Sequence, residues 1–365
     1  MASTETPPTP PPVPSFTAAE VLATGCVIPA HPLALNAQRK LDEPRQRALS
    51  RYYLAAGAGG LAVGVHTTQF AIHDPQVGLL RPILGLATEE MDRFEAETNK
   101  PLVRVAGLCG PTKQAVTEAA LAQELGYQYG LLNLGASGCN SVAELITHTQ
   151  HVAEAIDLFG FYLQPAVGGI DLPMGFWHRF CEIPQARAIK VAAFDRYKTI
   201  TVVRAVAESG RDDIALYTGN DDSIIFDLLS AYQFELHGRP VTRRFVGGLL
   251  GQWAVGTQAA VALLQQCHNI VRSGSPIPAA LLQQANALTD MNAVIFDVDH
   301  NFRGCIPGIH EILRRQGLLE GNWCLDAEEA LSPGQAQEID RVVGAYPSLS
   351  DDNFVAQHHR EWLSR

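Results

Sequence analysis

The chain has 365 residues, of which 47% are hydrophobic and 18% are charged, so it is long enough to bury a large core. Its 38 acidic residues outnumber its 27 basic ones, which gives a formal net charge of -11, and Lys and Arg form no dense stripe. This balance argues against nucleic acid or an anionic membrane surface as the main partner. A small-molecule partner is the better expectation.

The seven cysteines are scattered along the chain without a C-x-x-C pair, and their number is odd. This pattern indicates neither a disulfide framework nor a zinc cluster, so we expect a cytoplasmic protein without a metal site. Residues 1–15 are rich in proline and lack the regions of a signal peptide, and no run of 18 apolar residues occurs in the chain. We expect a disordered tail over 1–15 and no membrane span.

Eight short apolar runs follow this tail, and segments with apolar residues at intervals of three and four come between them. The runs cover residues 26–29, 61–65, 102–106, 130–134, 161–165, 188–194, 214–218 and 244–249. Eight strand–helix units over about 250 residues predict an α/β protein with a closed (β/α)8 barrel of the TIM type. A doubly wound open sheet is the alternative, but the glycine-rich segment 57–60 precedes a strand instead of opening a helix, so we interpret it as a turn.

The barrel is predicted to occupy residues 16–275, because the Ser-, Gly- and Pro-rich segment 273–278 breaks the pattern. Three further helices are expected at 279–288, 306–316 and 332–343, within a helical subdomain that covers residues 276–350. Residues 351–365 are expected to be a second tail. The fold prediction is therefore a (β/α)8 barrel with a C-terminal helical extension.

Lys190 lies within the sixth apolar run, and Tyr162 lies 28 residues before it in the fifth. A buried ammonium group is costly, and an amine that loses its proton in such a place becomes a nucleophile. A lysine at a strand end can also keep its charged head in water while its stem packs. The pair nevertheless suggests Schiff-base chemistry.

Several short segments around these two residues resemble the dihydrodipicolinate synthase and N-acetylneuraminate lyase superfamily, a group of class I aldolase-like (β/α)8 barrels. The similar segments are Tyr162-Leu163-Gln164-Pro165, Ile189-Lys190, Gly64-Val65-His66-Thr67-Thr68-Gln69, Thr218-Gly219-Asn220-Asp221 and Gly247-Gly248 with Gly251. They occur in the family's order. The resemblance covers the chain from about Gly25 to about Val343.

The resemblance implies a lyase that needs no cofactor and acts on a 2-oxo acid such as pyruvate or a 2-keto sugar acid. Lys190 would attack the ketone, and Tyr162 would relay protons. Thr67 and Thr68 would bind the substrate carboxylate, although which threonine does so stays open. The other residues expected to bind substrate are His66, Gln69, Gly219 and Asn220. A homodimer or homotetramer is also implied.

Two departures from the family pattern narrow this expectation. Val167 stands where the family's synthases carry an arginine for a second carboxylate, and segment 134–138 lacks the tyrosine that they share between subunits. An apolar side chain cannot replace a bidentate carboxylate contact. The chain is therefore not expected to be a true dihydrodipicolinate synthase, and its second substrate should be less charged.

Two other functions stay open at this point. The barrel could be a catalytically impaired keto-acid-binding or regulatory protein, or an enzyme without a Schiff base that uses His66 as a general base. The adjacent Asp221 and Asp222 could suggest a metal, but without partnering ligands we interpret them as a helix N-terminal cap.

Overall fold

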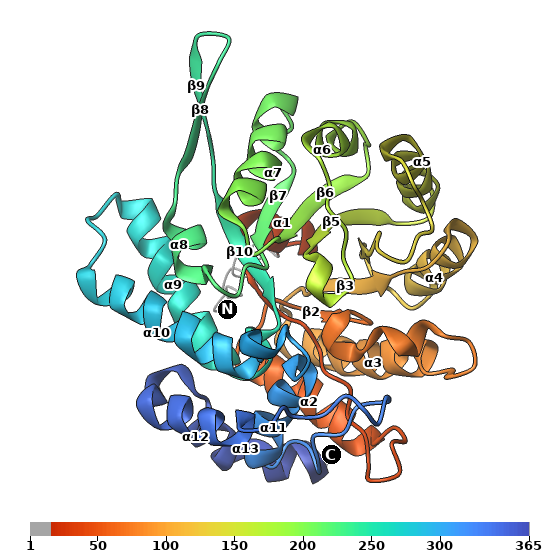
Figure 1. Cartoon of the computed structure of the whole chain (residues 1–365), viewed down its shortest axis with the longest axis vertical. Coiled ribbons are helices and arrows are strands. Elements are labelled where there is room, and N and C mark those ends of the chain that lie inside the picture. The colour runs from red at the N-terminus through yellow and green to blue at the C-terminus, as the bar shows by residue number, and fades with distance from the viewer. Residues whose placement is uncertain (1–15, 365) are drawn as a thin grey trace, which may run out of the picture.

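The computed structural model describes residues 16–364, so the tail expected over 1–15 lies outside the described residues. Its centre is a barrel of eight parallel strands in the order β1-β10-β7-β6-β5-β4-β3-β2 (Figure 1). The strands are β1 (Val27–Pro29), β2 (Gly60–Val63), β3 (Val103–Leu108), β4 (Tyr129–Leu132), β5 (Asp157–Leu163), β6 (Ala186–Ala192), β7 (Ala215–Thr218) and β10 (Phe245–Leu250). A parallel bridge between Ala30 and Ala62 joins the two ends of this sheet. The predicted (β/α)8 barrel is confirmed.

Helices pack around the barrel. They are α1 (Ala18–Thr24), α2 (Glu43–Ala55), α3 (Leu80–Thr98), α4 (Thr112–Glu124), α5 (Val142–Ala153), α6 (Met174–Cys181), α7 (Arg196–Ser209), α8 (Ile224–Leu229) and α9 (Thr257–Ser273). Of these helices, α2 to α8 connect the barrel strands. Local sequence fixes several helix starts, because Asp42, Ser141 and Asp195 accept hydrogen bonds from backbone N–H groups in the first turns of α2, α5 and α7.

Side chains along each barrel strand alternate between two separate cores. On β5, Phe159 and Phe161 pack in the cluster that fills the barrel, whereas Leu158 and Tyr162 pack in the cluster between the strands and the outer helices. This is the ordinary period of two for a strand. Phe161 is the register partner of Lys190 on β6, so these two side chains point to the same face.

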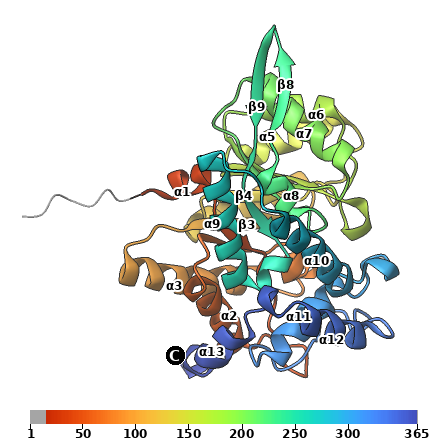
Figure 2. The same cartoon turned by 90° about the vertical axis from the view of Figure 1, so that its left-hand side faces the viewer.

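An antiparallel hairpin is inserted before the last barrel strand and was not predicted. It consists of β8 (Tyr232–Leu236) and β9 (Arg239–Arg243), and it projects beyond the helices in both views (Figures 1 and 2). His237 and Gly238 form its two-residue loop, with φ of 52° and 73°. Two positive φ angles fit the type I′ turn that matches the twist of paired strands.

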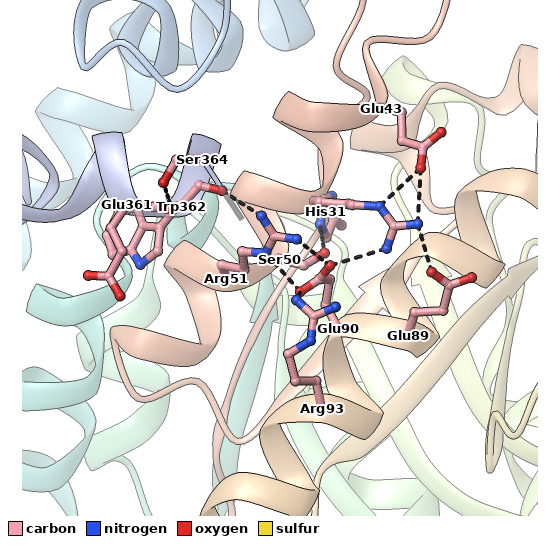
Figure 3. Close-up of polar contacts among 11 residues, drawn as sticks. His31, Glu43, Ser50, Arg51, Glu89, Glu90, Arg93, Glu361, Trp362 and Ser364 are labelled. Carbon is pink, nitrogen blue, oxygen red and sulfur yellow. Dashed lines mark hydrogen bonds and ion pairs between the residues drawn. The ribbon is translucent and has the colours of Figure 1, made fainter.

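The C-terminal extension contains four helices, α10 (Ala279–Ile295), α11 (Cys305–Arg315), α12 (Gln335–Ala345) and α13 (Asp352–Ser364). The expectation of a tail over 351–365 is wrong for residues 352–364, because α13 packs against α2 with Trp362 buried beside Tyr52 at a ring separation of 5.6 Å. Arg51 donates a hydrogen bond to the Trp362 carbonyl oxygen and also binds Glu90 of α3 (Figure 3). The extension is thus fastened to the barrel's own helices.

None of the helices within residues 16–364 is long and apolar enough to cross a membrane.

Candidate active site

Lys190 extends from β6 into the barrel and is 7% exposed. Its Nζ lies 4.6 Å from the centre of the Phe161 ring, and its stem passes Gly219, where an added Cβ would lie 2.7 Å from Lys190 Cε. Nζ makes no hydrogen bond with any residue in 16–364. Burial lowers the pKa of the amine from 10.5 to about 8, and the nearby Asp221 carboxylate opposes this shift.

A cavity opens beside the Lys190 amine at the carboxyl ends of the strands. Its walls are mostly apolar, and its ionisable lining residues are His66, Lys190, Asp221 and Cys305. The C-terminal extension covers it through Phe296, Phe302, Cys305 and Ile309. A second cavity shares five lining residues with this one and reaches Thr289 and Asn292 of α10. The active sites of such barrels lie at this same end of the strands.

Asp221 follows β7 and is buried in the cavity wall. One of its oxygens accepts a hydrogen bond from the Gln252 backbone N–H at 3.2 Å. Burial raises the pKa of its carboxyl group to about 7, and the positive charge of Lys190 works against that rise. The interpretation of Asp221 as a helix cap is therefore wrong. Its place directly after the seventh strand, at the catalytic face of a barrel, was the signal that could have identified it.

His66 lies in the short 3₁₀ helix η1 (His66–Thr68) after β2 and lines the cavity. Burial, and then the charge of Lys190, lower the pKa of its imidazole to about 4. His66 is consequently neutral near pH 7 and can take part in hydrogen bonds beside the amine.

The two threonines of the same loop, both expected to bind substrate, have different positions: one lines the cavity and the other bonds to the backbone. Thr67 lines the cavity, with its hydroxyl 3.4 Å from the His31 carbonyl oxygen. The Thr68 hydroxyl instead donates to that carbonyl oxygen at 2.6 Å and accepts from the backbone N–H groups of Gly64 and Val65. Thr68 therefore has no hydroxyl capacity left for a ligand, so of the two threonines only Thr67 faces the cavity.

Gln69 also belongs to the framework, because it turns away from the cavity. Its side-chain oxygen accepts a hydrogen bond from the backbone N–H of Leu325 at 2.6 Å, which ties the loop to the C-terminal extension. The expectation that Gln69 contacts substrate does not agree with this position.

Of the two residues after β7 that were expected to bind substrate, one lines the cavity and the other does not. Gly219 lines the cavity and leaves room for the Lys190 stem. Asn220 is buried outside it, where its amide donates to Thr199 and Asp227 and its oxygen accepts from the Phe194 backbone N–H at 3.0 Å. Asn220 thus supports the end of β6 instead of facing a ligand.

Tyr162 is not brought to Lys190. It points out of the barrel toward α6, where its ring lies 5.8 Å from that of Trp177, and its hydroxyl donates to Asp171 at 3.4 Å. Asp171 also accepts a hydrogen bond from Lys198. Because neighbouring residues of a strand face opposite sides, Phe161 occupies the inward position that was expected for Tyr162. The expectation of a proton relay through Tyr162 is corrected accordingly.

Val167 lines the cavity, and Lys190 is the single cationic side chain among its lining residues. The cavity therefore offers an anionic ligand one amine, and it offers apolar surface to the remainder of that ligand.

No protein-family model matches the sequence, and no curated protein matches it significantly. Comparison of structures gives many matches at low identity. The chain is similar to dihydrodipicolinate synthase from Oceanobacillus iheyensis, with 16% identity, a TM-score of 0.71, and coverage of 91% of this chain and 99% of that one.

Two further solved structures, both described as complexes with pyruvate, have similar scores. N-acetylneuraminate lyase from Fusobacterium nucleatum has 16% identity and a TM-score of 0.68 over 90% of this chain and 99% of that one. YagE, described as a member of the dihydrodipicolinic acid synthase family from E. coli K12, has 18% identity and a TM-score of 0.67 over 88% and 97%. The chain therefore has the fold of the solved dihydrodipicolinate synthases and N-acetylneuraminate lyases.

Proposed function

We propose that the protein is a divergent member of this superfamily, a lyase, aldolase or dehydratase that forms a Schiff base between Lys190 and a 2-oxo acid. The observation that carries the proposal is the buried Lys190 amine, whose pKa is lowered and which borders a cavity at the carboxyl ends of the strands. Pyruvate complexes of two proteins with the same fold support the choice of substrate class.

In the proposed reaction, the neutral amine attacks the keto carbon of the substrate. The nitrogen gives up one of its protons, the keto oxygen takes up two protons and leaves as water, and the iminium that forms keeps one N–H and withdraws electrons from the adjacent carbon–carbon bond. Two protons must therefore reach the departing oxygen. One of them can come from the amine nitrogen, and Asp221, whose raised pKa keeps part of the population protonated, is suited to donate the other.

The residues that line the cavity restrict the chemical class of the second substrate. Thr67 can offer a hydroxyl group to the carboxylate of the 2-oxo acid, but no arginine lines the wall at Val167 for another carboxylate. A reaction partner with an uncharged or apolar end fits this surface better than a dicarboxylate. The synthesis of dihydrodipicolinate is accordingly not proposed.

Reductive trapping tests the proposal. The protein is incubated with pyruvate and borohydride, and digestion followed by mass spectrometry should find a reduced pyruvyl adduct on the peptide that contains Lys190. Lys190→Met should abolish the adduct, whereas Lys198→Met, at a partly exposed site outside the barrel, should keep it. Absence of an adduct with pyruvate and with longer 2-keto acids would overturn the proposal, and turnover that survives Lys190→Met would favour His66 as a general base.

A keto-acid-binding or regulatory barrel without turnover is a second candidate. Phe161 favours it, because the side chain that pairs with Lys190 across the two strands has no hydroxyl group. This candidate predicts that pyruvate raises the melting temperature while no product forms with any partner aldehyde. The expected homodimer or homotetramer and the cytoplasmic location stay predictions, which light scattering and cell fractionation would check.

A further inference from the structure

Three buried side chains outside the Lys190 cavity bring a nitrogen, a sulfur and an oxygen together. They are His73 at the end of the 3₁₀ helix η2 (Phe70–His73), Cys109 directly after β3, and Glu118 of α4. One ligand atom from each lies within 4.8 Å of the other two. Imidazole, thiolate and carboxylate are the three side-chain ligands that zinc takes in proteins.

The imidazole of His73 has the orientation of a metal ligand. Its Nε2 lies 2.8 Å from the Gly64 carbonyl oxygen, so that nitrogen is held as a donor. Its Nδ1 donates a proton to a carboxylate oxygen of Glu118 at 2.9 Å, in an ion pair whose proton a metal ion would replace. Histidines that bind metal commonly hold their second nitrogen on a backbone carbonyl group in this way, which fixes the tautomer and the ring.

Glu118 is also positioned by neighbours that would remain in place around a metal. The Cys109 backbone N–H donates to one of its oxygens at 2.9 Å, and Gln114 donates to the other at 2.8 Å. A tetrahedral zinc ion needs ligand atoms roughly 3.3–3.6 Å apart, so the three groups require only small adjustments.

An opening leads to this cluster from the surface. His73 and Glu118 line an open cavity between α3 and α4, which shares no lining residue with the Lys190 cavity. The cavity supplies both an entry path and room for a water molecule as fourth ligand.

We propose that His73, Cys109 and Glu118 bind a zinc ion, with a water molecule completing the tetrahedron. On binding, the thiol of Cys109 and Nδ1 of His73 release their protons to solvent, and no other reactant is needed. The site joins the loop after β2, the end of β3 and helix α4. The sequence did not indicate it, because the ligands are 36 and 9 residues apart and follow no zinc-binding spacing.

Cobalt substitution tests the site without reference to turnover. The full chain, reduced and freed of metal by a chelator, is titrated with Co²⁺, and one equivalent should produce the thiolate-to-cobalt charge-transfer band of a tetrahedral centre. Cys109→Ser should lose the band, and Cys139→Ser, in a loop outside the cluster, should keep it. Zinc should displace the cobalt and raise the melting temperature of the native chain but not of Cys109→Ser.

Other results would overturn the proposal. These are the absence of a band in the native chain, or a band of the same intensity in Cys109→Ser. If Cys109→Ser does not fold, Glu118→Gln keeps the thiol while removing an anionic ligand. That variant should need at least tenfold more cobalt for half-saturation, and an unchanged requirement would refute the site.

Discussion

Two buried carboxylates in this protein are held in opposite ways. Glu90, between α2, α3 and α13, receives hydrogen bonds from the guanidinium groups of Arg47, Arg51 and Arg93 at 2.7–3.2 Å (Figure 3). Asp221 in the cavity accepts one bond to its side chain, from a backbone N–H, among the described residues.

The proton affinities of the two groups follow from these surroundings. Burial alone would raise the pKa of Glu90, but the arginines outweigh it and lower that pKa. For Asp221, burial outweighs the nearby positive charge of Lys190 and raises the pKa. A buried carboxylate with several charged hydrogen-bond donors, such as Glu90, stabilises the fold. A buried carboxylate with a single donor beside a cavity, such as Asp221, can exchange a proton with a ligand. The comparison separates a fastening point of the fold from a candidate reaction centre.

The largest expected effect is a loss of turnover on substitution of Asp221. If turnover were unchanged, the contrast between a structural Glu90 and a reactive Asp221 would fail. Asp221→Asn removes the group that is proposed to donate a proton, so the rate of the proposed reaction should fall by roughly 10²–10⁴-fold. The control is Asp212→Asn, an exposed carboxylate before the other end of β7, which should change the rate little. Equal rates for the two variants in steady-state assays would show that Asp221 is not part of the reaction.

Glu90→Gln should act on stability instead. Removing the negative charge leaves three guanidinium groups around a neutral amide, and the free energy of unfolding in urea should fall by about 3–5 kcal/mol. Glu89→Gln changes an exposed partner of Arg47 and should cost less than about 1 kcal/mol. Folded Glu90→Gln should still be trapped by pyruvate and borohydride at the native rate, and a slower rate would contradict the division of roles.

The pH dependence of trapping sharpens the comparison further. Attack requires the neutral amine, and the proposed loss of water requires protonated Asp221. The rate of adduct formation at Lys190 should therefore rise about tenfold per pH unit from pH 6, stay level between the two pKa values of about 7 and about 8, and fall at higher pH. Asp221→Asn should remove the fall at high pH and, since Asp221 raises the pKa of the amine, leave a single rise with its midpoint below pH 8. A midpoint near that of a free lysine, measured with a mild hydride reagent, would argue against burial of the amine.

The smallest effect is expected for Tyr162→Phe. The hydroxyl group bonds Asp171 on the outer side of the barrel, so its removal should lower the free energy of unfolding by about 1 kcal/mol and leave trapping at Lys190 unchanged. A large loss of trapping in this variant, with normal stability, would mean that the ring turns inward when ligand binds.

The sequence predicted the barrel and its lysine because these depend on repeated local patterns. Apolar runs alternating with amphipathic segments indicate strands and helices, and Lys190 was conspicuous within such a run. The hairpin was missed although its first strand alternates apolar and polar residues and His237-Gly238 is a typical two-residue turn, because it is inserted into the strand–helix repeat on which the fold prediction depends. Helix α13 was missed because its stability comes from packing on α2.

The site was harder to predict because it depends on which side each strand residue faces. The register between β5 and β6 shifts by one residue near Leu158 and Phe159, and Phe161 rather than Tyr162 pairs with Lys190. A shift of one residue exchanges the two faces of a strand, and no local motif encodes it. The role of Asp221 was not predicted for a related reason. Two adjacent aspartates resemble an exposed acidic turn, and the sequence does not show which of them is buried.

Gly219 affects the position of the Lys190 side chain through its lack of a side chain, without any ionisable atom. The space that a side chain would fill there belongs to the stem of Lys190 and to the Ala192 methyl group, at 2.7–2.9 Å. A single methyl group at this position would crowd the lysine from behind and displace its amine from the barrel axis. Descendants of this chain could thus lose their chemistry through one alanine while the barrel, its charges and its helices stayed intact.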